Sequence, residues 1–173
     1  MHHSDFLTMI ASIIKPNVYV ELGLYVGETI SKILPHVGHA YGVDIKNNDS
    51  LRELETNPKI TINYTGSSSF FDNFPHKIDM AFIDADHCCA SAMKDFDNVY
   101  KRLNDNGIIF MHDTHPISDF YITPGYCGDS YKLVPIYEQR SDINIITLPL
   151  TEAGLSMIMK KNSSRTYLRH LNN

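Results

Sequence analysis

The chain has 173 residues, and 15 Lys and Arg residues against 20 Asp and Glu residues give it a formal net charge of −5. Its length suits one domain around a single core, and this acidic balance argues against broad electrostatic binding to nucleic acid, which needs clustered Lys and Arg. No apolar run reaches the roughly 18 residues of a membrane-spanning helix. The start of the sequence lacks signal-peptide features, and its three cysteines have no C-x-x-C spacing. These features predict a cytoplasmic protein with reduced cysteines.

The predicted elements alternate between helices and short apolar strands. Residues 5–14 carry apolar side chains at helical spacing until Pro16 ends the run. An amphipathic helix with Met93 and Leu103 on its apolar stripe is predicted to stop at Asn106-Gly107. Other helices are predicted at 28–34, 49–55, 67–74 (a short helix or a turn) and 131–139, and buried strands at 18–23, 39–45, 59–65, 78–84 and 107–111.

Two further strands, 143–150 and 155–160, are joined by a turn that fits a hairpin. Apolar strands separated by amphipathic helices predict a parallel sheet covered on both faces. The predicted fold class is therefore α/β, a Rossmann-like, doubly wound, mostly parallel seven-stranded sheet with a C-terminal antiparallel hairpin. We expect a single domain over 1–173, divided into a helix region 1–16, a core 17–161 and a tail 162–173.

Polar residues follow every one of the five parallel strands, and ligands of such sheets bind beyond these carboxyl ends. The first end reads Glu21-x-Gly23-x-x-x-Gly27, in which glycines allow close approach of backbone N–H groups to a ligand. The spacing is not that of dinucleotide binders. An acid at position 21 would repel a pyrophosphate and favour a cation such as an amino group. A plain strand-to-helix turn is the alternative.

The next two ends are compatible with a nucleoside. Asp44 ends the second strand, where a carboxylate can accept two hydrogen bonds from a ribose diol. A helix cap or a solvated loop acid is the alternative reading. Ser67 and Ser68 follow the third strand and suit either an adenine edge or a helix cap.

The fourth and fifth ends gather acids and imidazoles. Asp84, Asp86, His112 and Asp113 should lie on adjacent strands, where three carboxylates and an imidazole indicate a shared cation or proton. Asp84, His112 and Asp113 offer oxygen and nitrogen ligands to one divalent ion. The alternative is that only Asp84 faces the pocket.

These residues resemble class I S-adenosylmethionine (SAM)-dependent methyltransferases. The segment Glu21–Gly27 (ELGLYVG) is similar to their first motif, and Val43-Asp44 to the second. The stretches 79–87 (DMAFIDADH) and 106–113 (NGIIFMHD) resemble the small O-methyltransferases related to the macrocin and novobiocin sugar enzymes, and more distantly the catechol type. The likeness covers roughly residues 15–160.

The resemblance implies SAM as cofactor and assigns site residues. In metal-dependent relatives, acids at the positions of Asp84 and of the pair His112-Asp113 hold magnesium, so His112 is a departure. Imidazole suits manganese, iron or zinc better. The implied metal ligands for a divalent ion (Mg or Mn) are Asp84, His112 and Asp113; the implied catalytic residues are Asp86 and His87; and the implied cofactor-binding residues are Glu21, Gly23, Tyr25, Gly27, Thr29, Asp44, Ile45, Ser67, Ser68 and Asp84.

The expected reaction is metal-assisted methylation of a small-molecule hydroxyl, with no nucleic-acid or membrane partner and with a homodimer left open. The loop 114–127, through Phe120, Tyr121 and Tyr126, is expected to supply a low-polarity pocket. A nicotinamide-dependent oxidoreductase and a non-catalytic SAM-binding domain are the alternatives. The missing third glycine and Glu21 count against the first, and carbon or nitrogen acceptors stay open. His2 and His3 are given no role.

Overall fold

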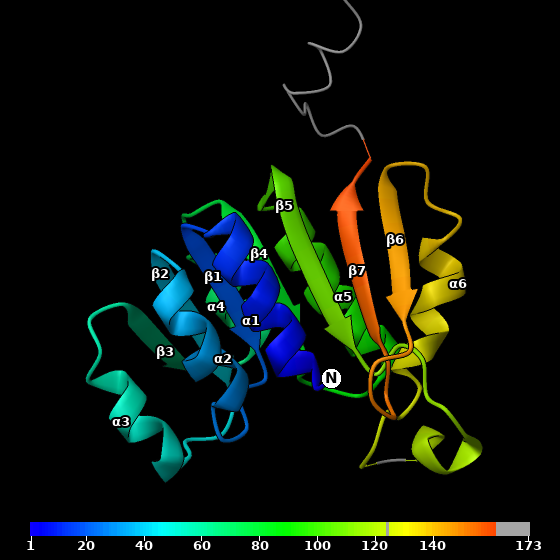
Figure 1. Cartoon of the computed structure of the whole chain (residues 1–173), viewed down its shortest axis with the longest axis horizontal. Helices are drawn as coiled ribbons and strands as arrows, with labels where there is room; N and C mark the ends of the chain where they lie inside the picture. The colour runs from blue at the N-terminus through cyan, green and yellow to red at the C-terminus, as the bar shows by residue number, and fades with distance from the viewer. Residues whose placement is uncertain (124, 162–173) are drawn as a thin grey trace, which may run out of the picture.

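The computed structural model describes residues 1–123 and 125–161. In this part of the chain, strands form one seven-stranded sheet in the order β3-β2-β1-β4-β5-β7-β6. The pairs among β1 to β5 are parallel, whereas β7 runs antiparallel to both β5 and β6. The strands are β1 (Val18–Leu22), β2 (His39–Asp44), β3 (Ile60–Tyr64), β4 (Ile78–Ile83), β5 (Leu103–His112), β6 (Ile143–Leu148) and β7 (Leu155–Lys160), as Figure 1 shows.

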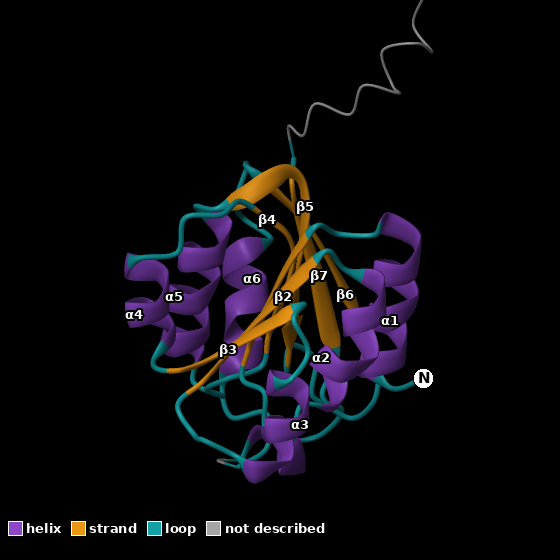
Figure 2. Cartoon of the chain, turned by 90° about the vertical axis from the view of Figure 1, so that its left-hand side faces the viewer, coloured by secondary structure: helices purple, strands orange, loops and turns teal. Residues whose placement is uncertain are grey.

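Helices cover both faces of the sheet, as the side view in Figure 2 shows. Phe71, Phe96 and Val99 are buried between one face and its helices, and Leu7, Ile30 and Ile33 are buried on the other. The helices are α1 (His3–Ile14), α2 (Glu28–Ile33), α3 (Arg52–Glu55), α4 (Ser67–Asp72), α5 (Cys89–Tyr100) and α6 (Leu133–Tyr137), with 3-10 turns at Leu34–His36, Asp49–Leu51, Asp119–Ile122 and Ser130–Lys132. Within the described residues, no helix combines the length and apolarity that a bilayer span requires.

The predicted fold class is confirmed, including the terminal hairpin. The boundary after α5 was predicted wrongly. The helix ends at Tyr100, and Leu103 is the first residue of β5 instead of the last residue of the apolar stripe. Asn106 and Gly107 lie inside this strand, where the register to β4 shifts. A Cβ atom on Gly107 would lie 2.7 Å from the side chain of Leu103, so the glycine permits a bulge rather than ending the helix.

Other predicted boundaries shift by a few residues. The predicted helix at 131–139 is a 3-10 turn followed by the short α6, and the strand predicted over 143–150 ends at Leu148. The long loop contains one 3-10 turn at Asp119–Ile122. The predicted tail 162–173 lies outside the described residues.

Candidate active site

Two adjoining pockets lie at the carboxyl ends of the parallel strands. The smaller pocket, of about 290 Å³, lies between the ends of β1, β2 and β3 and the start of α5. The larger pocket, of about 890 Å³, extends from β1 across the ends of β4 and β5 to the long loop. Gly23, Asp44, Ile45 and Ala85 line both pockets, so the two form one continuous cleft.

The turn after β1 depends on Gly23. Its φ of +87° is strained for any other residue, and a Cβ atom there would lie 2.1 Å from the carbonyl oxygen of Asp84. The turn can therefore pass directly beside the end of β4. Tyr25, at φ 50°, is 81% exposed and lines the larger pocket. The glycine thus brings the turn and the first acid of β4 to the same place.

Asp44 fastens this turn to the end of β2. Its Oδ2 accepts hydrogen bonds from the backbone N–H groups of Leu24 at 2.9 Å and Tyr25 at 3.2 Å, and its Oδ1 accepts one from Lys46 at 2.8 Å. The adjacent Ile45 side chain is 75% exposed and lines both pockets. A carboxylate and a bare apolar side chain therefore meet where the two pockets join.

The smaller pocket is polar on the side of α4 and α5. Ser67 and Ser68 line it, and the Ser67 hydroxyl donates a hydrogen bond to the carboxylate of Asp95. Burial raises the pKa of Asp95 above its ordinary value, although the bond from Ser67 opposes this. Asp86 is exposed and also lines the smaller pocket. The structure therefore separates Asp86 from Asp84, which lines the larger pocket.

Glu21 lies behind the turn. It is 1% exposed and lines neither pocket of the cleft, and its Oε2 accepts a hydrogen bond of 2.5 Å from the Tyr19 hydroxyl. Burial raises the pKa of Glu21 to about 8, and the nearby charge of Asp84 adds to the effect. Its carboxyl group therefore carries a proton at neutral pH, and the predicted contact with a cationic ligand stays a prediction.

Gly27 and Thr29 also lie away from the cleft. Gly27, at φ +79°, precedes α2, and Leu51 and Leu54 occupy the space that a Cβ atom would need. Thr29 is 7% exposed. Neither residue lines the two pockets. Their predicted contact with a cofactor also stays a prediction, and the structure gives both a place in the packing of α2.

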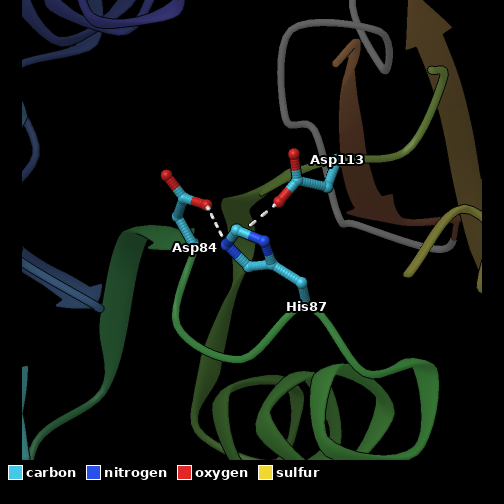
Figure 3. A group of neighbouring side chains, drawn as sticks. All are labelled: Asp84, His87 and Asp113. Carbon is cyan, nitrogen blue, oxygen red and sulfur yellow. Dashed lines mark ion pairs between the residues drawn. The ribbon is translucent and has the colours of Figure 1, made fainter. Parts of the chain in front are cut away.

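Four of the titratable side chains that line the larger pocket lie close together, and we call them the Asp84 cluster: Asp84, His87, His112 and Asp113. Nε2 of His87 lies 3.9 Å from Asp84 and 3.4 Å from Asp113, as Figure 3 shows. Nδ1 of His112 lies 3.3 Å from Asp84 and 3.4 Å from Asp113. One ligand atom each from Asp84, His87 and Asp113 lies within 4.8 Å of the others. The predicted metal trio had His112 in the place of His87.

Burial and charge act in opposite directions on the cluster. Burial lowers the pKa of His112, but its hydrogen bond to Asp84 and the charges of both acids outweigh this and raise that pKa. Burial opposes ionisation of Asp84, yet the bond and charge of His112 hold its pKa below the ordinary value. Burial raises the pKa of Asp113, and the charge of Asp84 contributes. The pKa values of the two acids therefore shift in opposite directions, and that of His112 shifts upward.

The end of the long loop and the two residues after it contact His87 and hold it in place. Its Nδ1 contacts the carbonyl oxygen of Tyr126. The backbone N–H of Asp129 donates to the carbonyl oxygen of His87 at 3.0 Å, and Gly128 approaches so closely that a Cβ atom would lie 2.1 Å from that oxygen. Because a carbonyl only accepts hydrogen bonds, Nδ1 of His87 is the donor. Nε2, the other ring nitrogen of His87, therefore faces Asp84 and Asp113.

Several residues of the larger pocket were missed from the sequence, among them His3 and Cys127. His3, at the start of α1, lines the pocket, and its ring centroid is 4.3 Å from that of His112. Burial and the charge of His112 lower the pKa of His3 to about 4. The buried thiol of Cys127 donates to Asp113, and burial raises the pKa of Cys127 to about 12. Neither residue carries a motif or a spacing that points to the site.

A family model described as a methyltransferase domain matches residues 20–114, which is more than half of the chain. The chain therefore belongs to this family of methyltransferase domains. With its doubly wound seven-stranded sheet and reversed β7, it is a class I SAM-dependent methyltransferase. A comparison with curated proteins finds none that matches its sequence.

Solved structures share the fold at low sequence identity. A methyltransferase from Podospora anserina with bound S-adenosylhomocysteine (SAH) has a TM-score of 0.73 and 15% identity, over 92% of this chain and 78% of that one. The O-methyltransferase TomG from Streptomyces achromogenes, in complex with SAM, has a TM-score of 0.71 and 13% identity, over 91% and 79%. An rRNA methylase from Streptococcus thermophilus has a TM-score of 0.66 and 11% identity, over 91% and 93%.

Proposed function

We propose that this methyltransferase transfers the methyl group of SAM to a hydroxyl oxygen of a small-molecule acceptor, with a divalent cation held by the Asp84 cluster. One observation carries the proposal: carboxylate oxygens of Asp84 and Asp113 lie within 4.8 Å of each other and of the His87 imidazole, in a pocket that Gly23 and Asp44 also line. The fold shared with the O-methyltransferase TomG supports the choice of oxygen.

The cleft fits the methyl donor in size and chemistry. The Asp44 carboxylate, at the junction of the pockets, has lone pairs left for a ribose diol after its three backbone contacts. The exposed Ile45 side chain offers a flat apolar face for an adenine, and Ser67 and Ser68 lie at its edge. The methionine end would lie in the larger pocket, which Gly23, Tyr25 and Asp84 line. When bound, SAM supplies a methyl group on a positively charged sulfonium.

The Asp84 cluster fits a divalent cation. The Asp84 and Asp113 carboxylates would hold it. Nδ1 of His112 is hydrogen-bonded to Asp84 at 3.3 Å and lies 3.4 Å from Asp113, and so helps to orient both acids. The nearby imidazoles favour manganese, iron or zinc over magnesium. A cation held there would supply Lewis-acid chemistry, which would lower the pKa of an acceptor hydroxyl.

His87 is the residue we place as proton acceptor. Its Nδ1 is engaged by the Tyr126 carbonyl, so the lone pair of Nε2 faces the pocket. The Asp84 and Asp113 carboxylates, 3.9 and 3.4 Å away, stabilise the positive charge that the ring acquires. Asp86, the other residue predicted for this role, lines the smaller pocket, where the nucleoside is proposed to bind.

Aromatic residues of the long loop would enclose the acceptor. Phe120 and Tyr126 lie 5.0 Å apart and Tyr121 and Tyr126 5.6 Å apart between ring centroids, and both tyrosines line the larger pocket. Positive charge on sulfur is neutralised during transfer to an oxyanion, so a pocket of low polarity favours the reaction. A small-molecule acceptor in the cytoplasm is proposed, because the chain carries a net charge of −5 and its three cysteines are free thiols.

The test is a transfer assay with a panel of hydroxyl acceptors in Mn²⁺, Mg²⁺ or excess EDTA, beside calorimetric titration with SAH. Asp84→Ala and Asp113→Ala should abolish metal-stimulated transfer and leave SAH binding largely intact, and His87→Ala should abolish transfer in the same way. Asp72→Ala, which changes an exposed acid at the end of α4, is the matched control. Activity that persists unchanged in EDTA would contradict the cation, and transfer only to nitrogen or carbon would contradict the hydroxyl acceptor.

A further inference from the structure

Helix α1 places an imidazole in the wall of the larger pocket. The ring centroid of His3, its first residue, lies 4.3 Å from that of His112 and 5.4 Å from that of Phe82. His3 lines the same pocket as Asp84 and Asp113. The helix therefore begins beside the carboxyl end of β5, where the N label stands in Figure 1.

Contacts with α2 hold the start of α1 in this place. Lys32 of α2 donates hydrogen bonds of 2.9 Å to both the Ser4 hydroxyl and the Asp5 carboxylate. Ser4 in turn donates to Glu28 at 3.3 Å. One turn further along α1, Leu7 is fully buried. His3 is thus presented to the pocket from a helix whose first turn is anchored.

The two nitrogens of His112 differ in their surroundings. Nδ1 faces the Asp84 and Asp113 carboxylates, whereas Nε2 is buried and has no hydrogen-bond partner among the described residues. Nδ1 of His3 is also buried, and it too has no hydrogen-bond partner among the described residues. Because no second hydrogen bond fixes the ring of His112, its plane is set by the rings packed on it, His3 and, at 6.2 Å between centroids, Phe82.

We propose that His3 is a positioning residue of the active site, whose ring holds His112 in the orientation that keeps Nδ1 hydrogen-bonded to Asp84 and close to Asp113. The inference rests on the proposed function, because its consequence concerns the cation that these two acids would hold. Loss of a partner that orients metal-binding groups weakens metal binding about 10- to 100-fold. His3 acts one contact further out, so we expect a change of about tenfold, at the lower end of that range.

The experiment is calorimetric titration of the full chain with Mn²⁺ and separately with SAH. The protein carries no polyhistidine tag, because the amino terminus adjoins the pocket. His3→Ala should raise the dissociation constant for Mn²⁺ about tenfold and leave that for SAH unchanged. His3→Phe keeps a packed ring and should stay near the wild-type affinity. In the transfer assay, His3→Ala should raise the KM for Mn²⁺ without changing kcat at saturating Mn²⁺.

Leu7→Ala is the matched control, because it removes a buried side chain from the same helix at a position that does not line the pocket. It should lower the free energy of unfolding and leave Mn²⁺ affinity unchanged. Equal Mn²⁺ affinity of wild type and His3→Ala, an equal loss in Leu7→Ala, or an equal loss in His3→Phe would overturn the role of His3 and leave the proposed function standing. A wild-type protein that binds SAH but no Mn²⁺ would overturn the proposed cation site and this inference together.

Discussion

The buried carboxyl group of Glu21 makes stability depend on pH in a direction opposite to that of an ion-paired acid. Burial raises its pKa in the folded chain from 4.5 to about 8, so the folded state keeps a proton that the unfolded state releases above pH 4.5. Stability therefore falls as pH rises from about 4.5 toward about 8. At about 1.4 kcal/mol per pKa unit, this group alone lowers the free energy of unfolding by about 2–3 kcal/mol between about pH 5 and pH 7.

Glu21→Gln isolates this contribution. An amide oxygen still accepts the bond from the Tyr19 hydroxyl, but the side chain no longer titrates. The free energy of unfolding is measured with urea at about pH 5 and pH 7. The difference between the variant and wild type should be about 2–3 kcal/mol more favourable to the variant at pH 7 than at pH 5. Glu53→Gln, which changes an exposed acid on α3, should show no such gain. A difference between Glu21→Gln and wild type that stays constant with pH would refute the reasoning.

Three further substitutions test the cleft. Asp44→Ala should weaken SAH binding at least about tenfold, because a hydrogen bond to a charged group contributes about 1.5–3 kcal/mol; unchanged affinity in calorimetric titration would reject the ribose assignment. Gly23→Ala should lower the free energy of unfolding by about 3 kcal/mol or more, since a Cβ atom would meet the Asp84 carbonyl oxygen at 2.1 Å; wild-type stability in urea would show that the turn relaxes. Ser67→Ala should reduce stability by about 1–3 kcal/mol, because the buried Asp95 loses its donor; a melting temperature equal to that of wild type would contradict this.

The sequence predicted the sheet well because its strands are short, apolar and separated by clear turn signals. The boundary at Leu103 failed because an apolar residue after an amphipathic helix suits the helix stripe and a buried strand equally. The orientations of the side chains that follow β4 were harder to predict, because a loop has no periodicity that fixes where each side chain points. Asp86 and His87 are adjacent in sequence, yet only His87 turns to Asp84 and Asp113.

Two further features could not be predicted: a contact between residues far apart in the sequence, and the burial of an acid. His3 and His112 meet only because α1 crosses the sheet with its first turn at the end of β5. The burial of Glu21 was not predicted, and its contact with a cationic ligand stays a prediction. In a strand buried on both faces, a side chain has no exposed direction except at the tip, and Glu21 lies within β1.

The tip of the β6–β7 hairpin is hydrogen-bonded to the start of the long loop. The N–H of His115 donates to the Ala153 carbonyl at 2.8 Å, that of Ile117 donates to Glu152 at 3.1 Å, and a Cβ atom on Gly154 would meet His115 at 2.4 Å. Glu152 and Ala153 face the same pocket as two loop tyrosines. If only the loop were exchanged to change acceptor preference, its hydrogen bonds and packing contacts with the hairpin would be lost. The loop and the hairpin tip therefore form one structural unit, and we expect a chimaera that exchanges both together to fold.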